Sequence, residues 1–301
     1  MGQHLSQTSY ASHTNYADTT AVNNSSDVAN TLLVSDADST VTTNATNNVT
    51  ATTNVWPFNT LADALNEPRL KSGDLVNLKE RITSHSGGAI WHVVCNSLKA
   101  NGYDSISSVA IPSLVLALNL TKQMTVEQFG AFSDGITDDT QTIQAAINSL
   151  AATFVKGATL ALNPNKSYKI SGAGLTIPSN ITLDCMFAKV EYTGSNTAMT
   201  LGDNANTLSY QPQVLNLQLK LQQKQSMGVI LFGTVRGKVT GNIEGCGNSQ
   251  SNVGVFVDGA NVSSYHNHIE VQCRHMKEGF RIGSTGSAAP ATQFFCRATQ
   301  L

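Results

Sequence analysis

The fold is decided by a short segment that returns three times along the chain: GVILFG at residues 228–233, GVFVDG at 254–259 and GFRIGS at 279–284. The intervals between these segments are 26 and 25 residues. A second series, NLQLKL at 216, NIEGC at 242 and HIEVQC at 268, returns at intervals of 26 and 26. A repeat of this length, built from strand-forming residues, predicts a coil of parallel strands stacked rung upon rung.

The alternation within these strands predicts which side chains face the interior of the coil. In the first series the inward residues are Val229, Leu231, Val255, Val257, Phe280 and Ile282, and the outward ones are Ile230, Phe232, Phe256, Asp258, Arg281 and Gly283. In the second series Leu217, Ile243 and Ile269 face inward, whereas Gln218, Glu244 and Glu270 face outward. Cys246 and Cys273 return at similar places and are expected to be small interior fillers.

The segment MTVEQFGAFSDGITDDTQTIQAAINSLAAT, at residues 124–153, predicts a strand, a turn and a helix in that order. Val126 and Phe129 are expected in the strand, and Asp134-Gly135 in the turn. Asp138 or Asp139 can accept backbone N–H bonds at the start of the helix. Ile143, Ala146, Ile147 and Leu150 then recur at helical spacing, which gives one apolar stripe that can cover the open end of the coil.

Two further regions precede this segment. Residues 56–125 contain the strand-like pieces DLVNLKE, AIWHVV and SLVLALNL, and a short helix over Leu61, Ala64 and Leu65 that Asn59 or Thr60 could cap. Residues 1–55 are polar, because Ser, Thr and Asn occupy 27 of these 55 positions. They predict either an extended arm that orders against a partner or a disordered tail.

Composition excludes several classes of protein. The 18 Lys and Arg residues nearly balance 20 Asp and Glu, so a strongly basic nucleic-acid binder is excluded. No run of 18 apolar residues exists, so no membrane insertion is expected. The five cysteines contain no C-x-x-C pair, which favours buried thiols over disulfides. No secretory signal is recognisable at the N-terminus.

The stretch FGAFSDGITDDTQTIQAAI, at residues 129–147, closely resembles the opening signature of the pectate-lyase-like β-helix proteins. The matching positions are Phe129, Gly130, Asp134, Gly135, Asp138, Asp139 and Thr140. In that family the signature leads into the helix that caps a right-handed parallel β-helix. It marks the fold and carries no catalytic residues, so it transfers no active site.

The preceding region resembles the connector domain that lies before this signature in phage tailspikes. The matching residues are Gly73, Asp74, Val76, Gly87, Gly88 and Trp91, although the Gly-rich turn is shorter and more polar than usual. The resemblance implies a mainly β protein with a polar N-terminal arm (1–55), a small β-rich connector (56–125) and a capped parallel β-helix (126–301, with rungs from 160). Since ATQFFCRATQL is still strand-like, we expect the β-helix to continue beyond residue 301.

The same resemblance implies a function. It predicts a homotrimeric phage tailspike, made in the host cytoplasm, that docks on tail or baseplate proteins through residues 1–55 and binds host surface polysaccharide. A depolymerase activity, hydrolase or lyase, is expected in the β-helix body, with its active site mainly outside these residues and no cofactor. The alternatives are a non-catalytic fibre or virion-anchoring protein, and a free-standing polysaccharide lyase or hydrolase.

Two outward clusters are the candidate sites. Glu244 and Glu270 are 26 residues apart, so they are expected on adjacent rungs about 4.8 Å apart, close to the spacing in retaining glycosidases. The alternative is a solvated ladder of Gln218, Glu244 and Glu270. Asp258, a further catalytic candidate, lies with Phe256 and Arg281 in a cluster that suits either sugar binding or a trimer contact.

A metal site is not expected. His266, His268, Cys273 and His275 are close in sequence, but their spacing differs from that of structural zinc sites. His268 and Cys273 are also expected on opposite faces of one strand, because their separation is odd.

Overall fold

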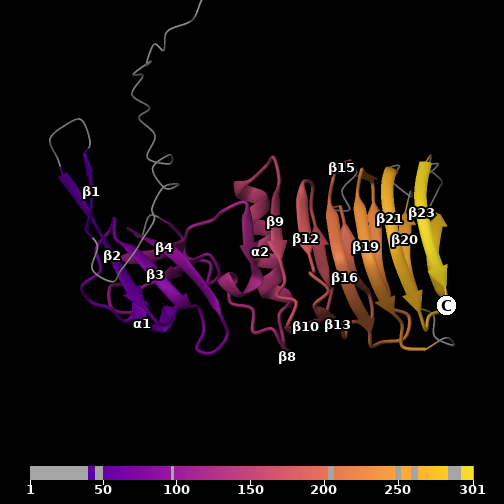
Figure 1. Cartoon of the computed structure of the whole chain (residues 1–301), viewed down its shortest axis with the longest axis horizontal. Helices are drawn as coiled ribbons and strands as arrows, with labels where there is room; N and C mark the ends of the chain where they lie inside the picture. Colours follow the sequence, from indigo (N-terminus) through magenta and orange to yellow (C-terminus); the bar gives the residue numbers. More distant parts are fainter. Residues whose placement is uncertain are drawn as a thin grey trace, which may run out of the picture. The chain divides into compact units, whose positions relative to one another are not determined.

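The computed structural model describes residues 40–44, 50–95, 98–202, 207–247, 252–258, 264–283 and 293–300 (Figure 1). All of these belong to one compact unit, Ala37–Leu301. The polar arm predicted over residues 1–55 lies mostly outside the described residues. Within the described part of the chain, no helix is long and apolar enough to cross a bilayer.

The first element is a six-stranded sheet in the order β1-β2-β3-β4-β6-β5. Its strands are β1 (Thr40–Asn44), β2 (Thr50–Phe58), β3 (Leu75–Glu80), β4 (Gly87–Cys95), β5 (Ser105–Ser107) and β6 (Leu114–Leu118). The three strand-like pieces read from the sequence form β3, β4 and β6. Strand β2 crosses the boundary expected at residue 56 and pairs in parallel with β3. Trp91, Val76 and Leu116 are fully buried in the core of this sheet.

The short helix α1 (Leu61–Leu65) is as predicted. The Thr60 side chain accepts from the backbone N–H of Asp63, and the Asp63 carboxylate accepts from the backbone N–H of Thr60 at 3.0 Å. This reciprocal capping box satisfies two backbone donors that the helix leaves open. Leu61 and Ala64 are buried below it.

The segment after the sheet differs from the prediction at two points, and one is that Asp134 and Gly135, expected in a turn, begin a strand. The predicted strand is β7 (Gln123–Thr125), and the expected strand residues Val126 and Phe129 form a 3₁₀-helix, η2 (Val126–Phe129). Gly130, at φ +100°, ends η2 in the left-handed region that favours glycine. Strand β8 (Asp134–Asp138) and helix α2 (Thr140–Thr153) follow. The apolar stripe of α2 is fully buried, as predicted.

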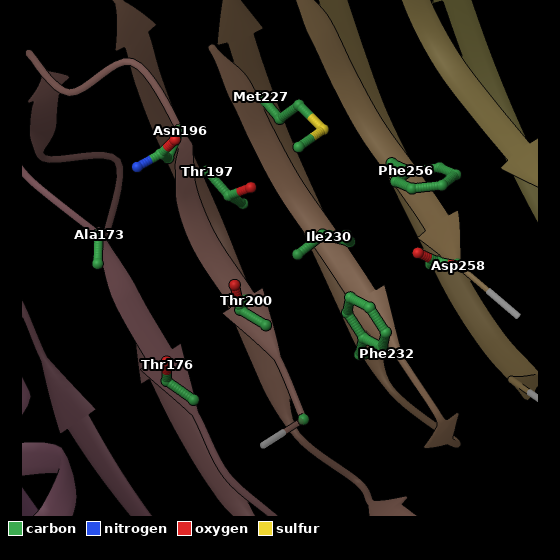
Figure 2. Close-up of a pocket in the computed structure, with 11 residues that line it drawn as sticks. Ala173, Thr176, Asn196, Thr197, Thr200, Met227, Ile230, Phe232, Phe256 and Asp258 are labelled. Carbon is green, nitrogen blue, oxygen red and sulfur yellow. The ribbon is translucent and has the colours of Figure 1, made fainter. Parts of the chain in front are cut away.

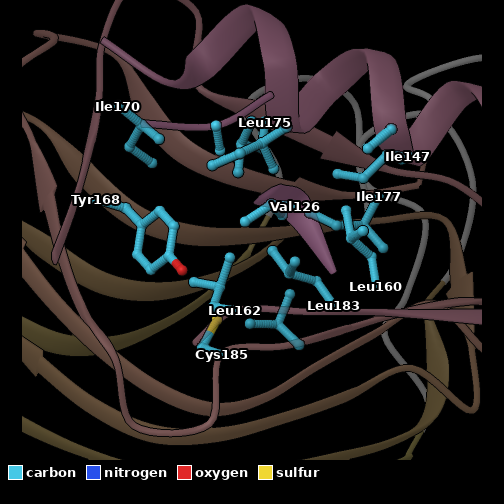
Figure 3. Packing of buried hydrophobic residues seen from close by; sticks show 14 of the residues in the cluster. Val126, Ile147, Leu160, Leu162, Tyr168, Ile170, Leu175, Ile177, Leu183 and Cys185 are labelled. Carbon is cyan, nitrogen blue, oxygen red and sulfur yellow. The ribbon is translucent and has the colours of Figure 1, made fainter. Parts of the chain in front are cut away.

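Helix α2 packs against β9, β11 and β12, the first strands of the coil. In Figure 3 the helix runs across the hydrophobic cluster, with Ile147 above Leu160 and Ile177. These three side chains are fully buried. The helix therefore covers apolar side chains of the first rungs that would otherwise face water.

The rest of the described chain is a parallel β-helix, which confirms the predicted fold. Every strand pair in it is parallel, and Figure 1 shows the strands lying side by side. One sheet has the order β11-β14-β17-β20-β22. Its strands are β11 (Leu175–Ile177), β14 (Thr197–Leu201), β17 (Met227–Phe232), β20 (Val253–Asp258) and β22 (Glu278–Gly283).

The second sheet carries the opposite side of each rung. Besides β7 and β8, its strands are β9 (Ala158–Ala161), β10 (Ser167–Ile170), β12 (Ile181–Asp184), β13 (Lys189–Tyr192), β15 (Ser209–Tyr210), β16 (Gln213–Leu221), β18 (Thr234–Val235), β19 (Lys238–Glu244), β21 (Tyr265–Arg274) and β23 (Gln293–Gln300). Strand β16 pairs with β12 through its first half and with β13 through its second. Two short strands of one rung thus become one strand in the next.

The first repeat series is confirmed in register, and the second is not. Val229 pairs with Val255, and Val255 with Phe280. Ile243, however, pairs with Leu219 and Cys273, at 24 and 30 residues. One interval is shorter than the 26-residue repeat and the other is longer. The constant spacing of similar segments in the sequence therefore hides a shift in the pairing of the strands. Because the shifts are even, the faces survive, and Leu217, Ile243 and Ile269 are buried as predicted.

Some predicted burials are wrong. Ile230 and Phe256 point outward but are only 6% and 3% exposed, because they form a second apolar cluster with Val253. Ile282, expected inside, is 48% exposed. Cys246 is exposed, whereas Cys273 is buried as expected. Cys246 lies beyond the end of β19, where its backbone N–H donates to Asn252 Oδ1 at 3.2 Å.

A buried polar joint connects the six-stranded sheet to the β-helix. Arg81 is 6% exposed, and its Nη1 donates to the carbonyl of Gln128 at 2.7 Å. Its guanidinium also lies 5.1 Å from the centre of the Trp91 ring, and burial lowers its pKa to about 10. Next to it, the buried Glu127 carboxylate accepts a bond from the hydroxyl of Tyr168 in β10.

Candidate functional site

The acidic residues of the signature bind backbone and hydroxyl groups. Asp134 Oδ1 accepts from the N–H groups of Ile136 and Thr137, both at 2.7 Å, and these bonds lower its pKa. The Asp138 carboxylate accepts from the N–H of Thr140, the first residue of α2, at 3.0 Å, so it binds a backbone donor at the start of the helix as predicted.

Asp139 does not cap α2, although it occupies the N-cap position. It is 1% exposed and accepts from the N–H groups of Phe132 and Ser133 at 2.8 and 3.0 Å. Burial raises the pKa of its carboxyl. The aspartates of the signature therefore bind neighbouring backbone N–H groups, and their structural role stays a prediction.

The proposed glutamate pair is not assembled. Glu244 lies between Lys220 and Arg274 on the neighbouring strands, and Glu270 lies opposite Thr240. Thr240 precedes Glu244 by four residues on the same strand, which places the two carboxylates about 13 Å apart. This distance exceeds the spacing that either class of glycosidase needs. The predicted adjacency is wrong, and the role of each glutamate toward a sugar stays a prediction.

The structure brings Asp258, Phe256 and Arg281 together on the outer face of β20 and β22. The Arg281 guanidinium lies 5.6 Å from the centre of the Phe256 ring and donates to both oxygens of Glu278, at 2.7 and 2.9 Å. Phe256 and Asp258 are 3% and 1% exposed. The Phe256 ring therefore packs in the protein and offers little surface to a ligand, and its sugar contact stays a prediction.

Phe256 and Asp258 border a groove of about 440 Å³ (Figure 2). In Figure 2 small side chains such as Thr176 and Thr200 lie on β11 and β14, and the larger Ile230 and Phe232 lie on the next strand. The step from small to large side chains hollows the outer face of the sheet. Its lining is mainly apolar.

The histidines near Cys273 do not converge. His268 is exposed while Cys273 is buried, so they lie on opposite faces of β21 as expected. His268 Nε2 is 3.7 Å from a Glu270 oxygen, and His275 Nδ1 is 3.5 Å from a Glu244 oxygen. Among the described residues, no group of three or more His, Cys, Asp or Glu side chains could hold a metal ion.

A second, more polar groove lies on the outer face of β16, β19 and β21. One half, of about 460 Å³, is lined by residues that include Lys220, Glu244 and Arg274. The other half, of about 390 Å³, includes Thr240 and Glu270. Asn242 and Gln272 line both halves and lie opposite each other in register. The two halves therefore form one continuous surface.

Phe187 lies at the edge of this polar groove, a position that the sequence analysis did not predict. It is 58% exposed, and Met186 before it is 42% exposed. Both residues have left-handed backbones, at φ 49° and 59°, which is uncommon for bulky residues. Phe187 continues the alternation of the buried residues Ile181 and Leu183 in the strand ITLD. The alternation therefore predicts an interior position for it.

Comparisons with known proteins add similar structures but no family. The sequence matches no family model and no curated protein. Among solved structures, ORF18 of Geobacillus virus E2 is 18% identical over 78% of this chain and 52% of its own, with a TM-score of 0.43.

Two phage proteins are similar at the same level. The tailspike gp49 of Acinetobacter baumannii bacteriophage Fri1, a capsular polysaccharide depolymerase, is 12% identical over 82% of this chain and 52% of its own, with a TM-score of 0.48. The enzymatically active domain of tailspike protein 2 of bacteriophage CBA120 is 14% identical over 71% and 34%, also with a TM-score of 0.48. This chain therefore spans a third to about half of these structures. The β-helix assignment rests on its own strand pairing.

Proposed function

We propose that this chain is part of a phage tailspike that attaches the virion to a host surface polysaccharide. The observation that carries the proposal is the order of parts. A small sheet is followed by the signature of residues 129–147, a covering helix and a parallel β-helix with a polar groove on its outer face. The signature resembles that of the pectate-lyase-like β-helix proteins, and the sheet residues Gly73, Asp74 and Trp91 match the connector domain that precedes it in phage tailspikes.

The proposal divides the chain into three functional parts. Residues 1–55 dock on tail or baseplate proteins, residues 56–125 connect, and residues 126–301 present the glycan-facing surface. The spike is a homotrimer, made in the host cytoplasm and carried on the virion. Light scattering tests the assembly, because a trimer would have about three times the 31.9 kDa mass of one chain.

Depolymerase activity is proposed for the β-helix body of the spike. The test is incubation of the purified chain, and of the spike that contains it, with polysaccharides from candidate hosts while released reducing ends are measured. Release by the spike supports a depolymerase. Binding without release supports the second candidate, a spike that only binds.

A further inference from the structure

We propose that Phe187 is the aromatic platform of a glycan-binding site in the polar groove on β16, β19 and β21. The inference rests on the proposed function, because it names the surface of the chain that a polysaccharide would contact. The ligand class is a neutral or sparsely charged sugar chain that carries hydroxyl or acetamido groups. Three observations carry it.

The first observation is that Phe187 is displayed at a cost to the fold. Its φ of 59° follows the 49° of Met186, so two adjacent bulky residues occupy a disfavoured region. Such strain persists only where the surroundings impose it, and it concentrates at functional sites. The ring is 58% exposed, so burial offsets little of this cost.

The second observation is a network that holds this turn in place. Asp184 Oδ1 accepts from the N–H of Met186 at 3.0 Å and from Asn216 Nδ2 at 2.9 Å. The N–H of Phe187 donates to the Asn216 carbonyl at 2.8 Å. Asn216 also lines the groove, and its N–H donates to Thr240 Oγ1 at 3.0 Å. The turn is thus fixed to the groove lining, which holds the exposed ring at its edge.

The third observation is the chemistry of the groove. Asn242 and Gln272 lie side by side on β19 and β21, and a side-chain amide both donates and accepts. Hydroxyl and acetamido groups need the same pairing of donors and acceptors. An aromatic ring beside such groups offers an apolar face to the C–H side of a sugar ring.

The charges along the groove limit the ligand class. The cations Lys189, Lys220 and Arg274 are balanced by Glu191, Glu244 and Glu270 on the same face. Lys189 Nζ is 2.7 Å from a Glu191 oxygen, and Glu244 lies between Lys220 and Arg274. The groove therefore carries charges of both signs and not the uniformly positive surface that would collect a strongly anionic polymer.

The experiment uses the full chain and an array of bacterial capsular and O-antigen polysaccharides, followed by titration of the best-binding array member. Phe187→Gly removes the ring and permits the left-handed backbone. We expect at least about tenfold weaker binding with an unchanged or higher unfolding temperature. Phe187→Trp should keep the affinity within about threefold, and its emission should shift on binding.

The matched control is Tyr210→Ala. Tyr210 is an exposed aromatic on the same coil, 50% exposed, but it does not line the groove. Binding should not change. If Phe187→Gly lowers the unfolding temperature, the ring is structural and the inference is overturned.

Three other results separate the proposals. If the wild type binds a glycan and Phe187→Gly binds it equally well, the inference fails while the proposed function stands. If the wild type binds no member of the array, the proposed function fails and the inference fails with it. If Phe187→Gly instead changes the oligomeric mass in light scattering, the ring contacts another copy of the chain, which also overturns the inference.

Discussion

Glu244 lies opposite Arg274 on the neighbouring strand, thirty residues later in the chain. The preceding rung is shorter, since Lys220 pairs with Glu244 at 24 residues. The outer face therefore carries Glu191, Lys220, Glu244 and Arg274 in alternating charge across four strands. Opposite charges on neighbouring strands stabilise a register modestly. This row therefore opposes slippage by two residues, which burial of the inward face does not oppose because an even shift leaves every side chain on its own face.

The register can be tested with cysteine pairs. Glu244→Cys with Arg274→Cys should form a disulfide on mild oxidation, because neighbouring parallel strands lie about 4.8 Å apart, within the range of a disulfide. Glu244→Cys with Glu270→Cys should not. Alkylation followed by mass measurement distinguishes them, in a background where the exposed Cys95 and Cys246 are replaced by Ser. A disulfide in the second pair alone would refute the register described here.

Gly241, in the lining of the polar groove, should not tolerate a side chain. A Cβ there would lie 2.1 Å from the carbonyl oxygen of Leu217, and φ is +135°. We expect Gly241→Ala to lower the free energy of unfolding by at least about 3 kcal/mol. The control is Gly172→Ala, which has a positive φ but open space around it and should cost only about 1 kcal/mol. Equal losses in urea unfolding would contradict the steric argument.

Tyr168 should make the fold sensitive to alkali. Burial, and then the bond to Glu127, raise the pKa of its hydroxyl above the ordinary value of 10.0. A raised pKa means that the folded chain holds its proton more tightly than the unfolded chain. The contribution to stability is therefore complete below about pH 10 and is lost as the pH rises further.

The test compares urea unfolding of the wild type and Tyr168→Phe between about pH 8 and about pH 10.5. The variant should be about 1–3 kcal/mol less stable at the lower pH, because Glu127 loses a buried donor. Its stability should then fall less steeply. Parallel curves for the two proteins would exclude Tyr168 as the source of the slope.

Phe256 and Arg281 should behave differently on truncation, although they touch. Phe256 is buried in the outward apolar cluster, so Phe256→Ala should cost about 3 kcal/mol of unfolding free energy. Arg281 is more exposed and pairs with Glu278 at the surface, so Arg281→Ala should cost less than about 1 kcal/mol. Thermal and urea unfolding of both variants measure this. A small loss for Phe256→Ala would mean that its ring is available to a ligand.

Much of the fold could be predicted from the sequence because alternation survives errors of register. The strand face of Ile243 was right even though its partner is Cys273 and not Ile269. What alternation cannot supply is the length of each connection, here between β19 and β21. That length decides which outward residues become neighbours, so the prediction that Glu244 and Glu270 are neighbours was wrong.

The groove edge was missed for a different reason. Phe187 is apolar and follows a buried strand, so periodicity places it inside. Its exposure comes from the left-handed turn imposed by Asp184 and Asn216, which lie on different rungs. Such a turn depends on tertiary contacts, so the local sequence around Met186-Phe187 does not predict it. The partners of Asp139 were not predicted either. An N-cap side chain is expected to bind N–H groups that follow it, whereas Asp139 binds those of Phe132 and Ser133, which precede it.

The joint made by Arg81, Gln128 and Trp91 has a mechanical consequence. Gly87 there approaches the backbone of Glu127 so closely that a Cβ would lie 2.2 Å from its carbonyl oxygen. Bending at this point would uncover a guanidinium-bound carbonyl and separate closely packed main chains. A pull or twist applied to the sheet is therefore transmitted to the first rungs through these contacts, which resist bending between the two parts.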